Sequence, residues 1–215
     1  MVRVYFADTA LLPDPAQESG FYSKLPGARL EKALRLKLPE KRRESAGAGL
    51  LLSCILPRFG ADAGEVYADA RGKLYHPRLT LCLAHGGGRV VLAVGTEPVG
   101  CDIEGLAPVR EGVLRRFSEA ERAFVEGAGE KERARAAAFY RIWTGKESFL
   151  KWTGEGLASW KETEVSFPDG RIFRDGKEQP CRVVWVEWGE YIVAVCSGEE
   201  TAEAEEIFLE GNISF

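Results

Sequence analysis

Apolar and polar residues alternate in several short segments of the chain, which is typical of β-strands with one buried face. Other segments repeat their apolar residues every three to four positions, which predicts helices. We expect strands at 3–7, 79–84, 89–95, 99–104, 164–167, 171–174, 181–187 and 191–197, with shorter extended pieces at 65–68 and 73–75. We expect helices at 18–39, 39–56, 109–117, 118–126 and 130–152.

Residues with known end preferences set the limits of these helices. Pro39 suits a first helical turn, Ser118 begins a capping-box spacing, and Gly154 suits a helix stop. Gly47 and Gly49 fall inside the second helix and weaken it by about 1 kcal/mol each. That helix therefore needs another element packed closely against these two glycines.

The segments 79–94 and 180–195 share one apolar pattern, which suggests an internal repeat. The run Arg89 to Val94 matches the run Glu190 to Val195, and each follows a predicted strand and a glycine. An apolar hairpin can also recur by chance. A true duplication would mean two α+β halves of about 100 residues each, joined near 98–105.

Composition and charge exclude several classes of protein. The 215 residues are 45% hydrophobic with a net charge of −4, so we expect a globular core and no strongly basic nucleic-acid surface. No apolar run approaches the roughly 20 residues of a membrane-spanning helix, and the start lacks a signal-peptide pattern. The odd count of five cysteines, without a Cys-x-x-Cys pair, predicts reduced thiols in a cytoplasmic protein.

Two acids follow an apolar run at the expected junction between the halves. On a strand, Asp102 and Glu104 point to one face while Cys101 and Ile103 point to the other. An exposed strand face would explain this pair. At a junction, however, two carboxylates repel each other unless water or a cation lies between them, and oxygen ligands favour Mg²⁺ or Mn²⁺.

A charged stripe also runs along the predicted helix 130–152. Trp143, Glu147 and Lys151 are spaced four residues apart, so each pair is separated by about 6 Å along the helix axis. A surface salt bridge between the last two, worth about 0.3–0.5 kcal/mol, is the simpler interpretation. The neighbouring side chains are mostly large and apolar, however, which favours a functional stripe.

Two further features could meet an anion. The segment 29–43 carries seven lysines and arginines against two glutamates, although a solvated helix face would look the same. It contains no aromatic residue for base stacking, which argues against RNA. His85 precedes three glycines whose amides could converge on a phosphate, although a plain hairpin turn is an equal alternative.

In this order and spacing, the motifs resemble the 4′-phosphopantetheinyl transferases of the surfactin-synthetase type. That family carries Gly-(Ile/Val)-Asp-(Ile/Val)-Glu and, about 40 residues later, Trp-x-x-Lys-Glu-x-x-x-Lys. The chain reads Gly100-Cys-Asp102-Ile-Glu104 and then Trp143-Thr-Gly-Lys146-Glu147-Ser-Phe-Leu-Lys151. The family's Gly-x-Gly-Leu follows as Gly154-Glu-Gly156-Leu157, and the resemblance extends from about residue 24 to 167.

The resemblance implies an α+β, pseudo-duplicated fold of two subdomains, each a small antiparallel sheet packed with helices, with the active site at their junction. Residues 1–100 would contact the 3′-phosphate and adenine of coenzyme A, and 101–215 would carry the acids and the Trp motif. The implied reaction is the Mg²⁺-dependent transfer of 4′-phosphopantetheine from coenzyme A to a serine of an apo acyl or peptidyl carrier protein, which releases 3′,5′-ADP. We expect a cytoplasmic monomer.

The resemblance also implies roles for single residues. Asp102, Glu104 and Glu147 would hold Mg²⁺, with Mn²⁺ as a substitute, and Glu147 would also take the serine proton. Lys151 would neutralise the pyrophosphate and the leaving phosphate. The expected contacts with coenzyme A are Arg43, Lys73, His85, Lys146 and Lys151.

Four positions depart from the family pattern. Ala84 and Gly86 replace the serines that flank His85, Leu74 replaces a proline, and Glu155 replaces a lysine. Two other functions use the same residues: a metal-dependent phosphohydrolase acting on coenzyme A, and a non-catalytic module that binds coenzyme A or a carrier protein. The intact acid and lysine set argues against the second.

Overall fold

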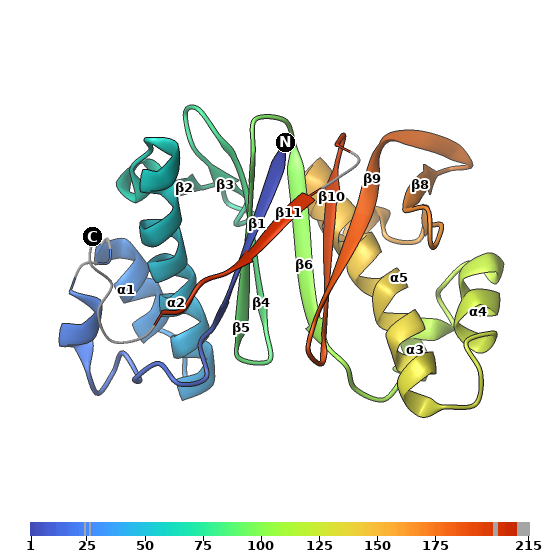
Figure 1. Cartoon of the computed structure of the whole chain (residues 1–215), viewed down its shortest axis with the longest axis horizontal. Helices are drawn as coiled ribbons and strands as arrows, with labels where there is room; N and C mark the ends of the chain where they lie inside the picture. The colour runs from blue at the N-terminus through green and yellow to red at the C-terminus, as the bar shows by residue number, and fades with distance from the viewer. Residues whose placement is uncertain (24, 26, 200–201, 210–215) are drawn as a thin grey trace.

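Two β-sheets pack face to face in the middle of the molecule, and helices cover their outer faces (Figure 1). The computed structural model describes residues 1–23, 25, 27–199 and 202–209, and of 157 and 158 the backbone alone. The architecture is α+β, as the sequence predicted.

The first sheet has the strand order β11-β1-β5-β4-β3-β2. Neighbouring strands are antiparallel, except that β11 runs parallel to β1. Its strands are β1 (Val2–Asp8), β2 (Tyr67–Ala68), β3 (Leu74–Tyr75), β4 (Thr80–Gly86), β5 (Arg89–Gly95) and β11 (Ala202–Glu206).

The second sheet is antiparallel and has the order β6-β10-β9-β8-β7. Its strands are β6 (Val99–Gly105), β7 (Thr163–Val165), β8 (Arg171–Arg174), β9 (Lys177–Trp188) and β10 (Tyr191–Ser197). The arrangement β1-β5-β4 of the first sheet therefore recurs as β6-β10-β9 in the second. This recurrence confirms the duplication that the two similar hairpins suggested.

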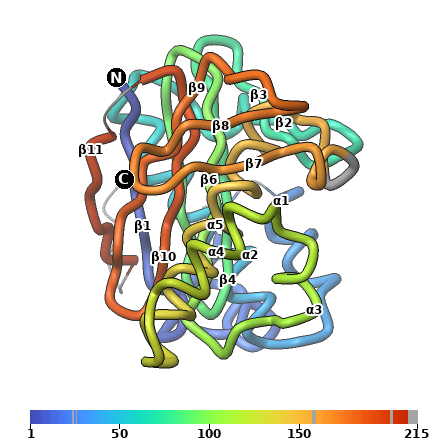
Figure 2. The backbone as a smooth tube through the Cα atoms, turned by 90° about the vertical axis from the view of Figure 1, so that its right-hand side faces the viewer, coloured from blue at the N-terminus to red at the C-terminus, as the bar shows by residue number. Residues whose placement is uncertain are grey.

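Helices flank the sheets on both outer sides. Seen from the side of the second half, α4 and α5 cover the face of its sheet that looks away from the first sheet (Figure 2). The helices are α1 (Gly27–Leu34), α2 (Pro39–Ile55), α3 (Glu111–Leu114), α4 (Glu119–Glu126) and α5 (Glu132–Thr153), with 3₁₀ turns η1 (Ser19–Tyr22), η2 (Leu56–Phe59), η3 (Ala63–Glu65) and η4 (Gly156–Ser159).

Strand alternation divides the apolar residues into three cores. In β1 and β5, Tyr5 and Leu92 face α1 and α2, whereas Val4 and Ala93 face the second sheet. A third core lies between α5 and the second sheet. The period of two therefore places one apolar face against the helices and the other against the partner sheet.

Two expected helices are shorter than predicted. The expected helix 18–39 is divided into η1 and α1, and 109–117 contributes the single turn α3. Leu38 is extended because it precedes Pro39, which disfavours a helical conformation in the residue before it. Helix α2 ends at Ile55, close to the expected end at residue 56, and Pro57 lies in the first turn of η2, where a missing N–H costs nothing.

Close packing explains the two glycines of α2. A Cβ at Gly47 would overlap Thr9 Cγ2, and one at Gly49 would lie 3.0 Å from Leu25 Cδ2. The neighbouring elements thus contact the helix where its propensity is weakest. The five cysteines are free thiols, and in the described ranges no helix combines the length and hydrophobicity needed to cross a membrane.

Candidate active site

Helix α5 lies directly on strand β6 because Gly100 has no side chain. A Cβ at Gly100 would overlap the carbonyl oxygen of Ser148 and lie 2.5 Å from the amide nitrogen of Trp152. The first glycine of the acid motif is thus a contact point between strand and helix backbones. This contact brings the face of α5 that carries Trp143 and Lys151 over the acids of β6.

We expect Gly100→Ala to destabilise the protein by about 1–3 kcal/mol, the usual effect of overfilling a packed site. The loss should appear as a lower midpoint of urea unfolding. Gly112→Ala is the matched control, because a Cβ there would come no closer than 3.9 Å to Arg115 Nη2. Equal stability of the Gly100→Ala variant and the wild-type protein would contradict the close approach.

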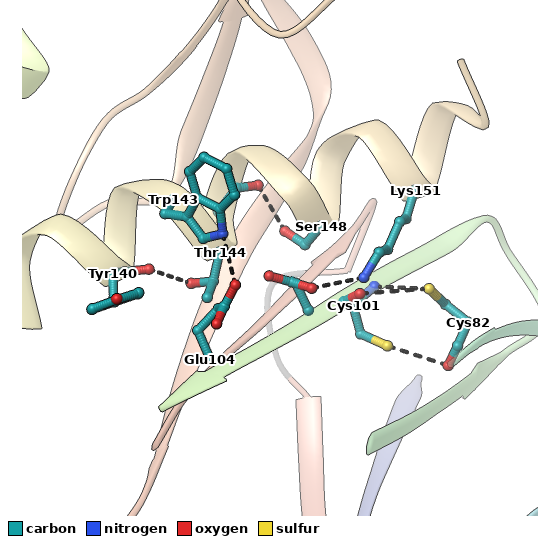
Figure 3. A network of polar contacts seen from close by, with 10 residues as sticks. Cys82, Cys101, Glu104, Tyr140, Trp143, Thr144, Ser148 and Lys151 are labelled. Atoms are coloured by element: carbon teal, nitrogen blue, oxygen red, sulfur yellow. Dashed lines mark hydrogen bonds and ion pairs between the residues drawn. The ribbon is translucent and has the colours of Figure 1, made fainter. Parts of the chain in front are cut away.

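Strand alternation directs the two acids of β6 toward α5. Cys101 and Ile103 lie in the core between the sheets, as expected. Lys151 Nζ lies 2.7 Å from Asp102 Oδ1, and Trp143 Nε1 donates to Glu104 Oε1 at 3.1 Å. Figure 3 shows Trp143 and Lys151 extending from the helix toward the strand that carries Glu104 and Cys101.

The electrostatics of these acids are those of crowded, poorly solvated carboxylates. Burial raises the pKa of Glu147 to about 7, and the charges of Asp102 and Glu104 add to the rise while Lys151 opposes it. Burial also raises the pKa of Asp102 against the opposing effects of Lys151 and, more weakly, of His85. The carboxyl groups are therefore close enough to disfavour one another's charge.

The acid group has the chemistry of a divalent-cation site. Asp102 Oδ2 and Glu147 Oε1 are buried acceptors with no hydrogen-bond partner among the described residues. Carboxylate oxygens are the ligands that Mg²⁺ and Mn²⁺ prefer. In the part of the chain that the structure describes, no three His, Cys, Asp or Glu side chains are gathered as a complete metal-binding group. The two free oxygens fit such a cation, while Asp102 Oδ1 is held by Lys151.

A pocket beside the acids is lined by both halves of the molecule. Lys73, from the turn between β2 and β3, and Cys82, from β4, face Glu147 and Lys151 of α5 across it. Lys73 Nζ also donates to the carbonyl oxygen of Trp152 at 3.2 Å. The sequence-predicted residues Lys73, Glu147 and Lys151 therefore border one cavity.

His85 and Arg43 are not among the residues that line this pocket. His85 lies near the end of β4, with Nδ1 3.1 Å from Glu44 Oε2. Arg43 is on α2, and its Nε is buried with no hydrogen-bond partner in the described part of the chain. Glu44 was not predicted as a functional residue, although it directly follows Arg43, an expected phosphate contact.

Lys146 lies apart from the acids. Its Nζ is 2.9 Å from the buried Glu121 carboxylate, donates to the carbonyl oxygen of Thr163 at 2.6 Å, and lies 4.3 Å from the ring centroid of Trp160. Adjacent helix residues point about 100° apart, so Lys146 faces α4 and β7 while Glu147 faces the pocket. This placement does not support the expected contact of Lys146 with coenzyme A.

Comparison with known proteins agrees with this geometry. A family profile described as the 4′-phosphopantetheinyl transferase superfamily matches residues 98–196, which hold Asp102, Glu104, Glu147 and Lys151. The 4′-phosphopantetheinyl transferase psf-1 of Bacillus pumilus is 31% identical over 77% of this chain and 75% of its own length. The chain belongs to the 4′-phosphopantetheinyl transferase superfamily.

Two more members of the superfamily are similar in sequence to this chain. The 4′-phosphopantetheinyl transferase HetI of Nostoc sp. (strain PCC 7120) is 32% identical over 64% of this chain and 62% of its own length. The 4′-phosphopantetheinyl transferase Sfp of Bacillus subtilis (strain 168) is 34% identical over 64% of each chain. The family, the fold and the enzyme class predicted from the motifs are therefore confirmed.

Proposed function

We propose that this chain transfers 4′-phosphopantetheine from coenzyme A to a serine hydroxyl of an apo acyl or peptidyl carrier protein and releases 3′,5′-ADP. The observation that carries the proposal is the meeting of Asp102, Glu104, Glu147 and Lys151 beside a pocket shared by the two halves. The relatives named as 4′-phosphopantetheinyl transferases support the same reaction.

In the proposed transfer, the serine oxygen forms a bond to the phosphorus that carries the pantetheine arm. The bond from that phosphorus to the bridging oxygen of the pyrophosphate breaks, and 3′,5′-ADP leaves. Glu147 accepts the serine proton, directly or through one water. Lys151 stabilises the negative charge that develops on the leaving phosphate.

The protonation of Lys151 suits this role. Burial alone would lower the pKa of its amine, but the nearby Asp102 carboxylate, together with the thiols of Cys82 and Cys101, outweighs burial and raises the pKa. The side chain therefore stays cationic at neutral pH. It offers an anionic substrate a positive charge beside the acids.

Asp102, Glu104 and Glu147 would hold Mg²⁺ or Mn²⁺ in the proposed enzyme. Their free oxygens, Asp102 Oδ2 and Glu147 Oε1, support this assignment. A bound cation neutralises the repulsion between the carboxylates and an anionic pyrophosphate.

The first half would supply the remaining contacts with coenzyme A, through Lys73 in the pocket and through His85 and Arg43 beyond it. The proposed division between residues 100 and 101 falls within β6, after its first two residues. Strand β11 comes after this division in the sequence but belongs to the first sheet. A monomeric state and a cytoplasmic location stay predictions.

We expect incubation of an apo carrier protein with this enzyme, coenzyme A and Mg²⁺ to add one phosphopantetheine mass to the carrier. Excess EDTA should abolish the gain, and Mg²⁺ or Mn²⁺ should restore it. Intact mass spectrometry of the carrier measures both. Cleavage of coenzyme A without a modified carrier would favour a phosphohydrolase, and binding without either product would favour a non-catalytic module. Full transfer in EDTA would contradict the metal assignment.

A further inference from the structure

Glu44 is a buried carboxylate that connects helix α2 to the turn between β4 and β5. Its side chain is only 1% exposed. Oε1 accepts a hydrogen bond from the amide of Gly88 at 2.9 Å, and Oε2 lies 3.1 Å from His85 Nδ1 and 2.9 Å from Lys41 Nζ. One side chain of α2 therefore contacts both ends of the glycine turn, the His85 imidazole and the Gly88 amide.

The contacts of Glu44 decide its charge. Burial alone would raise the pKa of this carboxyl, but hydrogen bonds from His85, Lys41 and the Gly88 amide outweigh burial and lower it to about 2. At neutral pH the group is a carboxylate, which can accept hydrogen bonds but cannot donate them. Nδ1 of His85 must therefore carry the proton in the contact with Glu44.

This contact leaves Nε2 as the ring nitrogen of His85 that can meet a ligand. The His85 side chain is 45% exposed, so a ligand can reach it. With Nδ1 protonated, Nε2 donates to a phosphate only when the ring is a cation, and a carboxylate 3.1 Å away attracts that positive charge. The orientation of the imidazole thus depends on Glu44.

The surroundings of the turn place it at the junction of the halves. Gly87 and Gly88 both have positive φ angles, +59° and +80°, which favour glycine. From the second half, Tyr191 donates its hydroxyl to the carbonyl oxygen of Gly87 at 2.7 Å. The charge of His85 is also near enough to lower the pKa of Asp102. His85 therefore lies between Glu44 of the first half and the acids of the second.

We propose that Glu44 is a positioning residue, which holds His85 with Nδ1 bound and Nε2 turned toward a phosphate group of coenzyme A. The inference rests on the proposed function, because coenzyme A supplies that phosphate. Glu44 itself touches neither substrate nor reacting atoms in this arrangement. It acts through the imidazole and through the Gly88 amide that fixes the turn.

A double-mutant cycle on the full-length protein tests this role. Calorimetric binding of coenzyme A is measured for the wild-type protein, Glu44→Gln, His85→Ala and the double variant. We expect His85→Ala to raise the Kd for coenzyme A about tenfold, the effect of losing one charge-assisted hydrogen bond. Glu44→Gln should raise it at least about threefold in the wild-type background and less than about twofold when His85 is already alanine.

Asp8→Asn is the matched control. It removes the 2.6 Å ion pair with Arg89, one residue beyond the same turn, and leaves His85 and Glu44 untouched. Its affinity for coenzyme A should equal that of the wild-type protein. If Glu44→Gln does not fold, Glu44→Asp takes its place in the cycle, because it keeps the charge and withdraws the carboxylate by one methylene.

The outcomes separate this inference from the proposed function. The role of Glu44 would be overturned if Glu44→Gln lowered the affinity for coenzyme A equally in both backgrounds, or not at all in the wild-type background. Carrier modification by the wild-type protein would in that case still support the transferase. A wild-type protein that neither binds coenzyme A nor modifies a carrier would overturn both. A loss confined to the wild-type background, with turnover at saturating coenzyme A unchanged within about twofold, supports the inference.

Discussion

A Glu147→Gln variant is expected to transfer phosphopantetheine at least about 100-fold more slowly than the wild-type protein. Glutamine keeps the size of the side chain but removes both the proposed acceptor of the serine proton and one negative charge for the cation. Binding of coenzyme A should weaken less, since Asp102 and Glu104 remain. Single-turnover transfer and calorimetric binding of coenzyme A measure the two effects separately.

The fold should survive this substitution. The charge of Asp102 helps raise the pKa of Glu147, so a neutral amide relieves repulsion and the free energy of unfolding should not fall. Glu132→Gln is the matched control, because Glu132 is exposed in the first turn of the same helix. Transfer at the wild-type rate by the Glu147→Gln variant would show that this face of α5 is structural.

Periodicity predicted the elements that carry the site. The period of two correctly gave the faces of β6, with Asp102 toward the helix and Cys101 toward the core between the sheets. The spacing of Trp143, Glu147 and Lys151 likewise placed three side chains on one side of α5. These patterns are local, so a single sequence is enough to show them.

The partner of Lys151 could not be predicted in the same way. The sequence offers Glu147 at the i,i+4 position, whereas the ion pair in the structure joins Lys151 to Asp102, 49 residues away. That pairing depends on the contact of α5 with β6 at Gly100, which no local rule describes. It also means that removing Lys151 would leave a buried carboxylate without its counter-charge, a larger change than the loss of a surface pair.

Strand β11 was missed for a different reason. Its residues 202–206 are alanines and glutamates, which have low strand propensity. The strand forms because β1 offers a free edge, and its acids meet bases of the first half: Glu203 lies 3.6 Å from Arg3 and Glu205 lies 2.8 Å from Arg58. Tertiary pairing and charge therefore decide the structure of a segment whose own pattern predicts none.

The motif shared with the family does not separate lysines of different roles. Lys146 and Lys151 both belong to it, but helix geometry turns Lys146 toward Glu121 of α4. The Glu121 carboxylate also accepts the amides of Ser118 and Val165 at 2.9 Å. One buried ion pair thus joins α5 to α4 and β7.

Lys146→Met is therefore expected to lower the free energy of unfolding by about 3–5 kcal/mol, because it leaves Glu121 as a buried charge without its cation. Both side chains are only 1% exposed, so water cannot replace the lost partner. Burial lowers the pKa of Lys146 and the Glu121 carboxylate opposes that effect, so the charge of Lys146 depends on Glu121. Equilibrium unfolding in guanidinium chloride measures the change.

Two further variants show whether burial is the cause. Arg133→Met breaks the 2.6 Å ion pair between Arg133 and Glu190, whose side chains are 67% and 61% exposed, respectively. This change should lower the free energy of unfolding by less than about 1 kcal/mol. Adding Glu121→Gln to Lys146→Met should restore part of the lost stability, since the uncompensated charge is gone. The restoration is partial because Ser118 and Val165 donate to different carboxylate oxygens, and a glutamine offers only one oxygen. A Lys146→Met variant no less stable than Arg133→Met would show that the Glu121 carboxylate needs no counter-charge in the folded protein.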